Sequence, residues 1–66
     1  MYPKPMKYTV ENTSTLREFI AQLGEHTLYA YDRRVIGVVV NNKRLWDSAK
    51  IAPGDIVTIF PIIVGG

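Results

Sequence analysis

A single helix with both start and stop signals lies near the middle of the first half of this chain. Thr15 and Glu18 have the three-residue spacing of a capping box, in which the hydroxyl accepts from an unpaired amide and the carboxylate reaches back to the cap. Gly24 suits the left-handed residue that ends a helix. Because the apolar residues between them form one stripe, the helix must pack against a second layer. The stripe follows i, i+3, i+4 and i+7 spacing: Leu16, Phe19, Ile20 and Leu23.

The segments on either side of this helix have the patterns of β-strands. In residues 6–10 apolar and polar side chains alternate, which indicates a strand with one face on a core and one in water. Residues 35–40 are almost all β-branched, as in a strand that is covered on both faces or lies deep in a sheet. Residues 56–60 form the last strand, with Val57 and Ile59 on one face. We therefore expect an α+β domain in which one helix packs across a mixed sheet of about four strands.

The connections between these strands contain turn-forming residues. Asn41 and Asn42 tolerate positive φ, so they predict a two-residue turn that pairs residues 43–46 with the preceding strand as a hairpin. The tripeptide at 53–55, Pro-Gly-Asp, predicts a tight turn before the last strand. Between these turns, Ile51 is expected to return to the core.

Other segments set the limits of the domain. Residues 25–34 have no clear period, and the pattern leaves them unassigned beyond a crossover that includes a turn. Pro61 has no amide to give to a sheet, so strand pairing should stop near it. We expect one domain over residues 1–61 and a flexible arm over residues 62–66, about 16 Å long when extended. The first and last strands are expected to be neighbours.

Length, charge and cysteine content exclude several classes of function. A domain of 66 residues buries only about 60% of the surface of its unfolded chain, which leaves no material for an enclosed active site. Without cysteine there is no thiol nucleophile, and the lone His26 has no second ligand, so neither a metal nor a bound cofactor is expected. The net charge of +2 is too small and scattered to mark a nucleic-acid binder. No apolar run reaches the ~20 residues that span a bilayer, so we expect no membrane partner and a cytoplasmic location.

The aromatic residues have two interpretations each. Tyr8, Tyr29 and Tyr31 lie near basic residues and could stack on bases, but packing in the core and at its rim is the favoured interpretation. Trp46 either anchors an interface or covers one end of the sheet. Asp55 is interpreted as a turn residue, and no pair of carboxylates has a spacing that indicates catalysis.

The last five residues are the strongest functional signal. Gly65 and Gly66 occupy the final two positions, an arrangement that arises by chance about half a percent of the time at ~7% glycine. They follow three apolar residues, Ile62, Ile63 and Val64, which would be a liability unless they met a partner. Glycines without a Cβ can thread a narrow channel and bring the terminal carboxylate to the α-phosphate of ATP. With a pKa of about 3.5, this carboxylate is ionised near neutral pH.

The ending of the chain, residues 54–66, resembles that of the ThiS/MoaD family of sulfur carriers, which serve thiamine and molybdopterin synthesis. Residues 14–23 and 38–41 are similar to the helix and a strand of that family, and the similarity covers residues 7–66. The resemblance implies a ubiquitin-like β-grasp fold and a carrier that is not itself an enzyme. It implies that an E1-like adenylating enzyme uses ATP to adenylate Gly66 and that sulfur replaces AMP to leave a thiocarboxylate. Thiazole synthase or the molybdopterin synthase large subunit would then take the sulfur.

The resemblance also implies roles for single residues and leaves some choices open. Phe60 before Pro61 resembles the molybdopterin-side carriers, whereas Trp46 in a longer loop resembles the thiamine side. Two other functions stay open: a protein modifier joined to target lysines, and a β-grasp binding module without tail chemistry. The implied roles are attachment at Gly66, threading at Gly65, and docking on partners by Phe60, Ile62, Ile63 and Val64.

The start of the chain departs from the family pattern. Family members have two strands before the helix, and residues 8–23 resemble the second strand and the helix, which leaves only residues 1–6 for the first. Pro3 and Pro5 would interrupt its pairing. The N-terminal hairpin is therefore expected to be shortened. Either the single N-terminal strand takes the central place beside the final strand, or another subunit supplies the missing edge.

Overall fold

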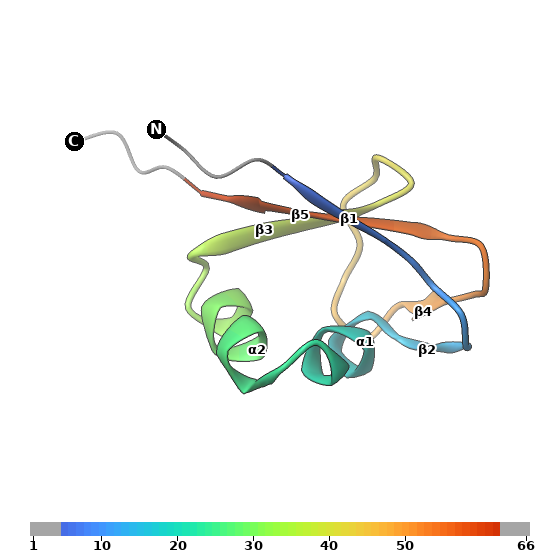
Figure 1. Cartoon of the computed structure of the whole chain (residues 1–66), viewed down its shortest axis with the longest axis horizontal. Helices are drawn as coiled ribbons and strands as arrows, with labels where there is room; N and C mark the ends of the chain where they lie inside the picture. Colours follow the sequence, from blue (N-terminus) through green and yellow to red (C-terminus); the bar gives the residue numbers. More distant parts are fainter. Residues whose placement is uncertain (1–4, 63–66) are drawn as a thin grey trace.

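The computed structural model describes residues 5–62, which form two helices below one face of a small sheet (Figure 1). The Gly-Gly ending and the first four residues lie outside the described part of the chain. In chain order the elements are β1 Met6–Thr9, β2 Ser14–Thr15, α1 Leu16–Gln22, α2 Glu25–Asp32, β3 Ile36–Val40, β4 Lys50–Ile51 and β5 Ile56–Pro61.

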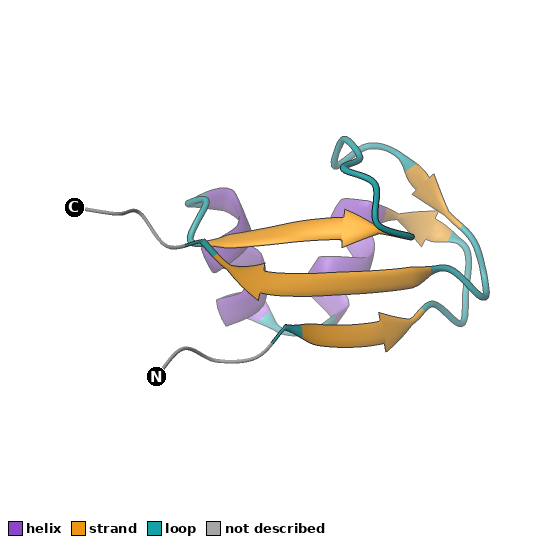
Figure 2. Ribbon diagram, turned by 90° about the horizontal axis from the view of Figure 1, so that it is seen from above, coloured by secondary structure: helices purple, strands orange, loops and turns teal. Residues whose placement is uncertain are grey.

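The main sheet has the strand order β1-β5-β3, and both pairings are antiparallel (Figure 2). Tyr8 lies opposite Val57 on one side of β5, and Val38 lies opposite Ile59 on the other. The prediction that the first and last strands are neighbours is therefore confirmed. The central strand is β5, however, and β1 lies at the edge, so the single N-terminal strand does not take the central place.

Two further expectations about the sheet are corrected by the described residues. The sheet is three-stranded and antiparallel rather than a mixed sheet of four strands, and a second sheet pairs β2 with β4. One reason is that β2 pairs with β4 instead of with β1, so these two strands make no N-terminal hairpin. Another is that pairing after the Asn41–Asn42 turn stops at the single bridge between Val40 and Lys43. Both asparagines do have positive φ, 51° and 67°, as predicted.

Helix α1 begins with the capping box that the sequence predicts. The Thr15 hydroxyl accepts from the Glu18 amide at 3.2 Å, and the Thr15 amide donates to Glu18 Oε1 at 2.9 Å. Leu16 and Ile20 are fully buried, and Phe19 packs edge-on against Tyr8 of β1 with the ring centroids 6.4 Å apart. The predicted helix therefore packs on the sheet with the predicted face.

The second helix, α2, was not predicted, and the expectation of one helix is corrected. Its segment shows no clear period because none of its residues is fully buried, and only part of it, including Leu28 and Tyr31, packs on the core. Gly24, with φ of 133°, separates α1 from α2 and allows the change of chain direction that an L side chain would resist. A half-buried short helix leaves only a weak trace in the pattern of apolar residues.

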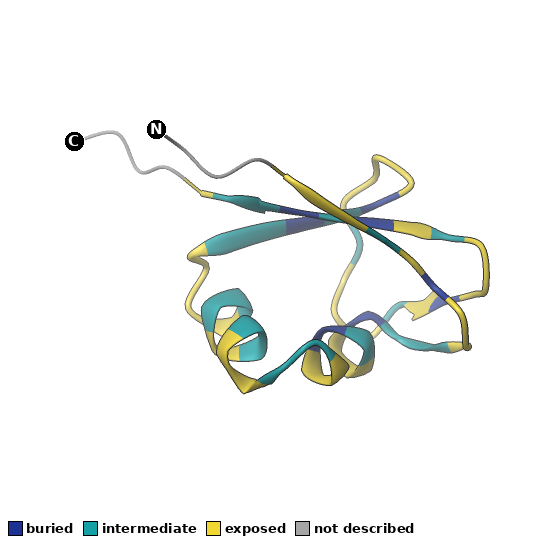
Figure 3. Ribbon diagram, in the orientation of Figure 1, coloured by how far each residue is buried: buried dark blue, intermediate teal, exposed yellow. Residues whose placement is uncertain are grey.

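The core lies between the sheet and α1, where the buried residues of Figure 3 meet. Ile51 is buried there as expected, although it comes from the loop side of the molecule. Neither helix of the described residues covers the opposite face of the sheet (Figure 1). Residues 35–40 were expected to form a strand that is covered on both faces or lies deep in a sheet, and both alternatives are wrong, because β3 has one face without a helix and lies at an edge of the described sheet. The buried set is Val10, Leu16, Ile20, Val38, Val40, Ile51, Val57 and Ile59.

The loop after β3 is attached to the start of α1 through the backbone. The Leu16 amide donates to the carbonyl of Ala49 at 2.9 Å, and the Arg17 amide donates to the carbonyl of Asp47 at 3.0 Å. These bonds satisfy amides that an isolated helix would leave unpaired. They also hold the loop away from β3, so that the loop and the strand do not pack against each other.

We predict that stability falls in acid, partly through Asp55. Its carboxylate accepts from the Ala52 amide at 2.8 Å and from Asn41 Nδ2 at 3.1 Å, and these bonds lower its pKa from the ordinary value. Because the folded pKa is depressed, the contribution is present above the unfolded pKa of about 3.9 and is lost as the pH falls through the folded value. The midpoint of urea unfolding should therefore be lower at about pH 2.5 than at about pH 7. Asp55→Asn should reduce this difference, and an unchanged difference in that variant would contradict the role of the carboxylate.

Candidate functional site

The described part of the predicted site lies at the end of β5. Phe60 is half-buried and Ile62 is 41% exposed. Two residues apart on an extended segment, they point to the same face, which is the one that the helices leave uncovered. The Ile62 amide donates to the carbonyl of Val35 at 2.9 Å, so pairing continues one residue past Pro61. Ile63, Val64, Gly65 and Gly66 lie outside the described residues, and their predicted roles stay predictions.

The Phe60 ring lies over Gly37 on the neighbouring strand. Gly37 is the register partner of Phe60, and a Cβ built on Gly37 would lie 2.4 and 2.5 Å from two carbons of the ring. Such distances are far below van der Waals contact, so only glycine leaves room for the ring in this position. The absence of a side chain at Gly37 thus allows the Phe60 ring to lie over β3 on the uncovered face.

We predict that Gly37→Ala lowers the free energy of unfolding by about 1–2 kcal/mol, because the new methyl group displaces the Phe60 ring from its position over β3. In a Phe60→Ala background the same substitution should cost nothing or be slightly stabilising, since alanine is better than glycine in a strand by roughly 0.5–1 kcal/mol. Urea unfolding of the four proteins measures the coupling. An equal cost in both backgrounds would show that the ring is not what Gly37 accommodates.

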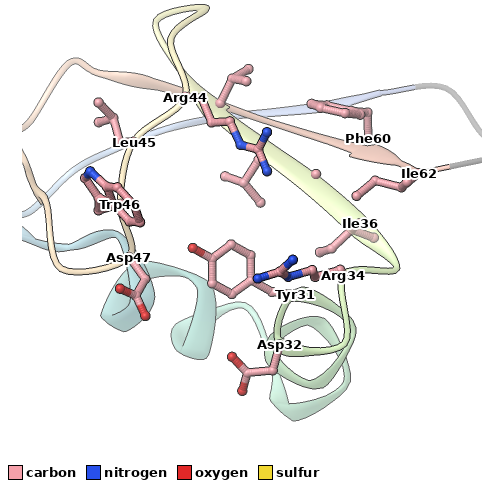
Figure 4. Close-up of a pocket in the computed structure, with 13 residues that line it drawn as sticks. Tyr31, Asp32, Arg34, Ile36, Arg44, Leu45, Trp46, Asp47, Phe60 and Ile62 are labelled. Atoms are coloured by element: carbon pink, nitrogen blue, oxygen red, sulfur yellow. The ribbon is translucent and has the colours of Figure 1, made fainter.

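A hollow of about 670 Å³ opens beside β3, next to Phe60 and Ile62 (Figure 4). We call it the β3 hollow. Its walls come from the end of α2, from the strand itself, from the loop after it and from the end of β5. The lining residues are Tyr31, Asp32 and Arg34, residues 36–39, residues 44–47, and Phe60 with Ile62.

The charges around the β3 hollow are unevenly paired. Both carboxylates are matched by Arg17, which donates to Asp32 at 2.6 and 2.9 Å and lies 3.9 Å from Asp47. The hydrogen bond from Arg17 lowers the pKa of Asp32, so this carboxylate is ionised near neutral pH. Arg34 and Arg44 have no salt-bridge partner among residues 5–62. Arg44 lies on the strand side of the hollow, Arg34 lies beside Tyr31 at the end of α2, and the two carboxylates lie toward the helices (Figure 4).

The family model named ThiS family matches residues 4–66. This chain belongs to the ThiS family. The match covers almost the whole sequence and includes the Gly-Gly ending, and the fold of residues 5–62 is consistent with a β-grasp domain. No curated protein and no solved structure gives a significant match to the chain.

Membership of the ThiS family settles the general kind of molecule. Proteins of this family are small carriers rather than enzymes, and the chain is placed among sulfur carriers of biosynthesis. Membership also implies, in general terms, an adenylating enzyme and a synthase as partners. Neither of the helices that the structure describes has the length and apolar character of a membrane span. Within the same residues, no three histidine or carboxylate side chains gather as they would around a metal ion.

Several residues of this ThiS-family surface were not predicted from the sequence. Gly37 was the one residue of the 35–40 run that is not β-branched, and an isolated glycine in a strand is a known sign of close approach by another group. Arg34 and Arg44 gave no local signal, because they are ten residues apart and only the fold brings both to the β3 hollow. Trp46 is 84% exposed and does not cover the end of the sheet, so that interpretation is wrong. The loop that bears it is held by α1 instead of by the sheet.

Proposed function

We propose that this chain carries sulfur as a thiocarboxylate on its C-terminal residue, Gly66. The observation that carries the proposal is the family match, which runs to residue 66 and so includes both final glycines. The uncovered sheet face supports it, because Phe60 and Ile62 present apolar surface at the end of β5, next to the Gly-Gly ending in the sequence. Exposed apolar groups of this kind are typical of a surface that docks on a protein.

The proposed chemistry begins with the terminal carboxylate, which is ionised near neutral pH. Bound to an E1-like adenylating enzyme, one carboxylate oxygen attacks the α-phosphorus of ATP, and pyrophosphate leaves. Sulfide then attacks the carbonyl carbon of the acyl adenylate, and AMP leaves. The resulting thiocarboxylate is the sulfur donor for thiazole formation or for molybdopterin formation. All catalytic groups belong to the partners, and this chain contributes the carboxylate and the surface on which they dock.

The residues of this chain divide into two roles under the proposal. Phe60, Ile62, Ile63 and Val64 contact the partner, whereas Gly65 and Gly66 enter its active site. Glycine suits the second role because a chain without Cβ atoms fits a narrow channel.

The proposal is tested by incubating the whole protein with ATP, sulfide and an E1-like adenylating enzyme and then weighing it. We expect a mass gain equal to the difference between one sulfur and one oxygen, and its loss when ATP is omitted. The product should then give up this sulfur to thiazole synthase or to the molybdopterin synthase large subunit, which identifies the pathway. Larger adducts joined to lysine amines of other proteins, with no sulfur-bearing form, would instead indicate a protein modifier.

A further inference from the structure

The outer edge of β3 has backbone groups that no described residue pairs with. On the β5 side, hydrogen bonds from Ile62 to Val35 and from Asn41 to Ile56 bracket the strand. In an antiparallel pair, the N–H and C=O groups of successive residues point alternately toward the partner strand and away from it. Those of Gly37 and Val39 therefore point toward β5, and those of the even-numbered residues of β3 point outward.

Of these outward-facing residues, only Val40 is paired. It exchanges bonds of 2.8 and 2.9 Å with Lys43, and no backbone bond of residues 5–62 reaches the outward groups of Ile36 and Val38. An unpaired edge of this kind is a template for a further strand. Four polar groups of β3 are therefore available for pairing.

The β3 hollow runs along this same edge. Ile36 and Val38 line it, and Leu45 and Trp46 line the facing wall. The backbone bonds of the 47–49 loop to α1 keep that wall away from the strand. An added strand lies only about 4.8 Å from its neighbour, and a hollow of about 670 Å³ is within the usual range for binding clefts. The space beside the free edge thus suits an extended segment with apolar side chains.

Two arginines project over this space with no salt-bridge partner among the described residues (Figure 4). Arg34 occupies the left-handed position after α2, with φ of 58°, where a Schellman motif ends the helix. Its amide bonds to Tyr31 O at 3.1 Å, and the Val35 amide bonds to Ala30 O at 2.9 Å. Glycine is the usual residue at this position, since a Cβ there costs roughly 1–2 kcal/mol. Arg34 therefore places a long cationic side chain at a position where the backbone conformation favours glycine.

We propose that the outer edge of β3 binds an extended, apolar partner segment that carries an acidic side chain. The segment pairs with the backbone of Ile36 and Val38 and places its carboxylate by Arg34 and Arg44. A second copy of this chain is disfavoured as the occupant, because β3 has no acidic residue and pairing two copies would bring four arginines together. This interaction does not depend on the terminal glycines, so it is separate from the carrier chemistry.

The direct test is an NMR titration of the whole protein with the acetylated, amidated peptide Val-Ile-Val-Val-Asp-Glu. We expect the amide signals of Ile36 and Val38 to shift and their hydrogen exchange to slow about tenfold or more at saturation. The same peptide with Lys-Lys in place of Asp-Glu should bind at least about tenfold more weakly. Methylating the peptide amides that face β3 should abolish binding, and methylating the alternate amides should not.

Four outcomes would overturn the proposal. The first is unchanged exchange at Ile36 and Val38 with saturating peptide, and the second is equal binding of the lysine peptide. The third is a shift confined to Lys7 and Thr9, which would place the peptide on the β1 edge. The fourth is slow exchange of Ile36 and Val38 in the free protein that depends on its concentration, because the edge would then be closed by a second copy.

Matched variants test the arginines. Arg44→Glu should weaken binding about tenfold or more, whereas Lys43→Glu, which changes the same charge one residue away and outside the hollow, should change it by about twofold or less. Arg34→Gly should weaken binding while raising the urea midpoint, which separates loss of the guanidinium from loss of the fold. Full binding by Arg34→Gly or by Arg44→Glu would refute the role of the arginines.

Discussion

Removing Gly65 and Gly66 should abolish adenylation and thiocarboxylate formation while leaving the free energy of unfolding unchanged. The activity is lost because the terminal carboxylate is then on Val64, two residues or roughly 7 Å of extended chain short of its position in the whole protein. The β-branched side chain of Val64 would also have to enter the narrow channel that the glycines occupy under the proposal. The fold is kept because, among residues 5–62, the buried core runs from Val10 to Ile59. ATP–pyrophosphate exchange with an adenylating enzyme measures the first effect, and urea unfolding measures the second.

A matched control for this deletion is Gly66→Ala, which keeps the length of the arm. It should retain the fold and lose part of the ATP–pyrophosphate exchange activity, since the added methyl group crowds the channel of the adenylating enzyme without changing the position of the carboxylate. The carrier role would be wrong if the two-residue deletion exchanged pyrophosphate as fast as the whole chain. It would also be wrong if the biological function of the chain survived the deletion, because a binding module without tail chemistry would behave in that way.

Replacing Ile20 by alanine should unfold much of the protein. Ile20 is fully buried between α1 and the sheet, and truncation of such a side chain costs about 2–5 kcal/mol. A domain of this length has a total stability of about 3–10 kcal/mol at 0.05–0.15 kcal/mol per residue. Ile20→Ala therefore removes a large part of the total. Circular dichroism and urea unfolding at 25 °C measure the loss.

The control for this second prediction is Gln22→Ala on the same helix. Gln22 is exposed, and alanine has the higher helix propensity, so its unfolding free energy should change by less than about 0.5 kcal/mol. Similar effects of the two substitutions would mean that α1 does not pack on the sheet by the Ile20 face. The arrangement of the core would then have to be revised.

The parts of the fold that the sequence could predict are those that depend on neighbours along the chain. The capping box of Thr15 and Glu18 joins residues three apart, and it has the predicted geometry. The Asn41–Asn42 turn and the two faces of β5 are likewise local consequences of residue type and alternation. The helix α2 was missed because its residues are half-buried, and a half-buried helix has no strong apolar stripe.

The candidate site was predictable only in part. Phe60 and Ile62 were predicted as docking residues because they precede the distinctive ending, and the family match includes that ending. The contact of Phe60 with Gly37 could not be derived, because the two residues are more than twenty positions apart in the sequence and only the register of β3 with β5 brings them together. The β3 hollow was missed for a similar reason: residues 43–46 were expected to pair with β3, and they turn away after one bridge.

By itself, the sequence determined which segments form α1 and the strands of the main sheet, which face of α1, β1 and β5 is apolar, and that the chain ends in two glycines after an apolar run. Only the tertiary structure decided that β5 is central, that both pairings are antiparallel, and that Arg34 and Arg44 share one hollow. The physical reason is the distance along the chain over which each interaction acts. Helix caps, turns and alternation follow from backbone preferences over a few residues, whereas strand order and shared surfaces follow from how the whole chain buries its apolar side chains.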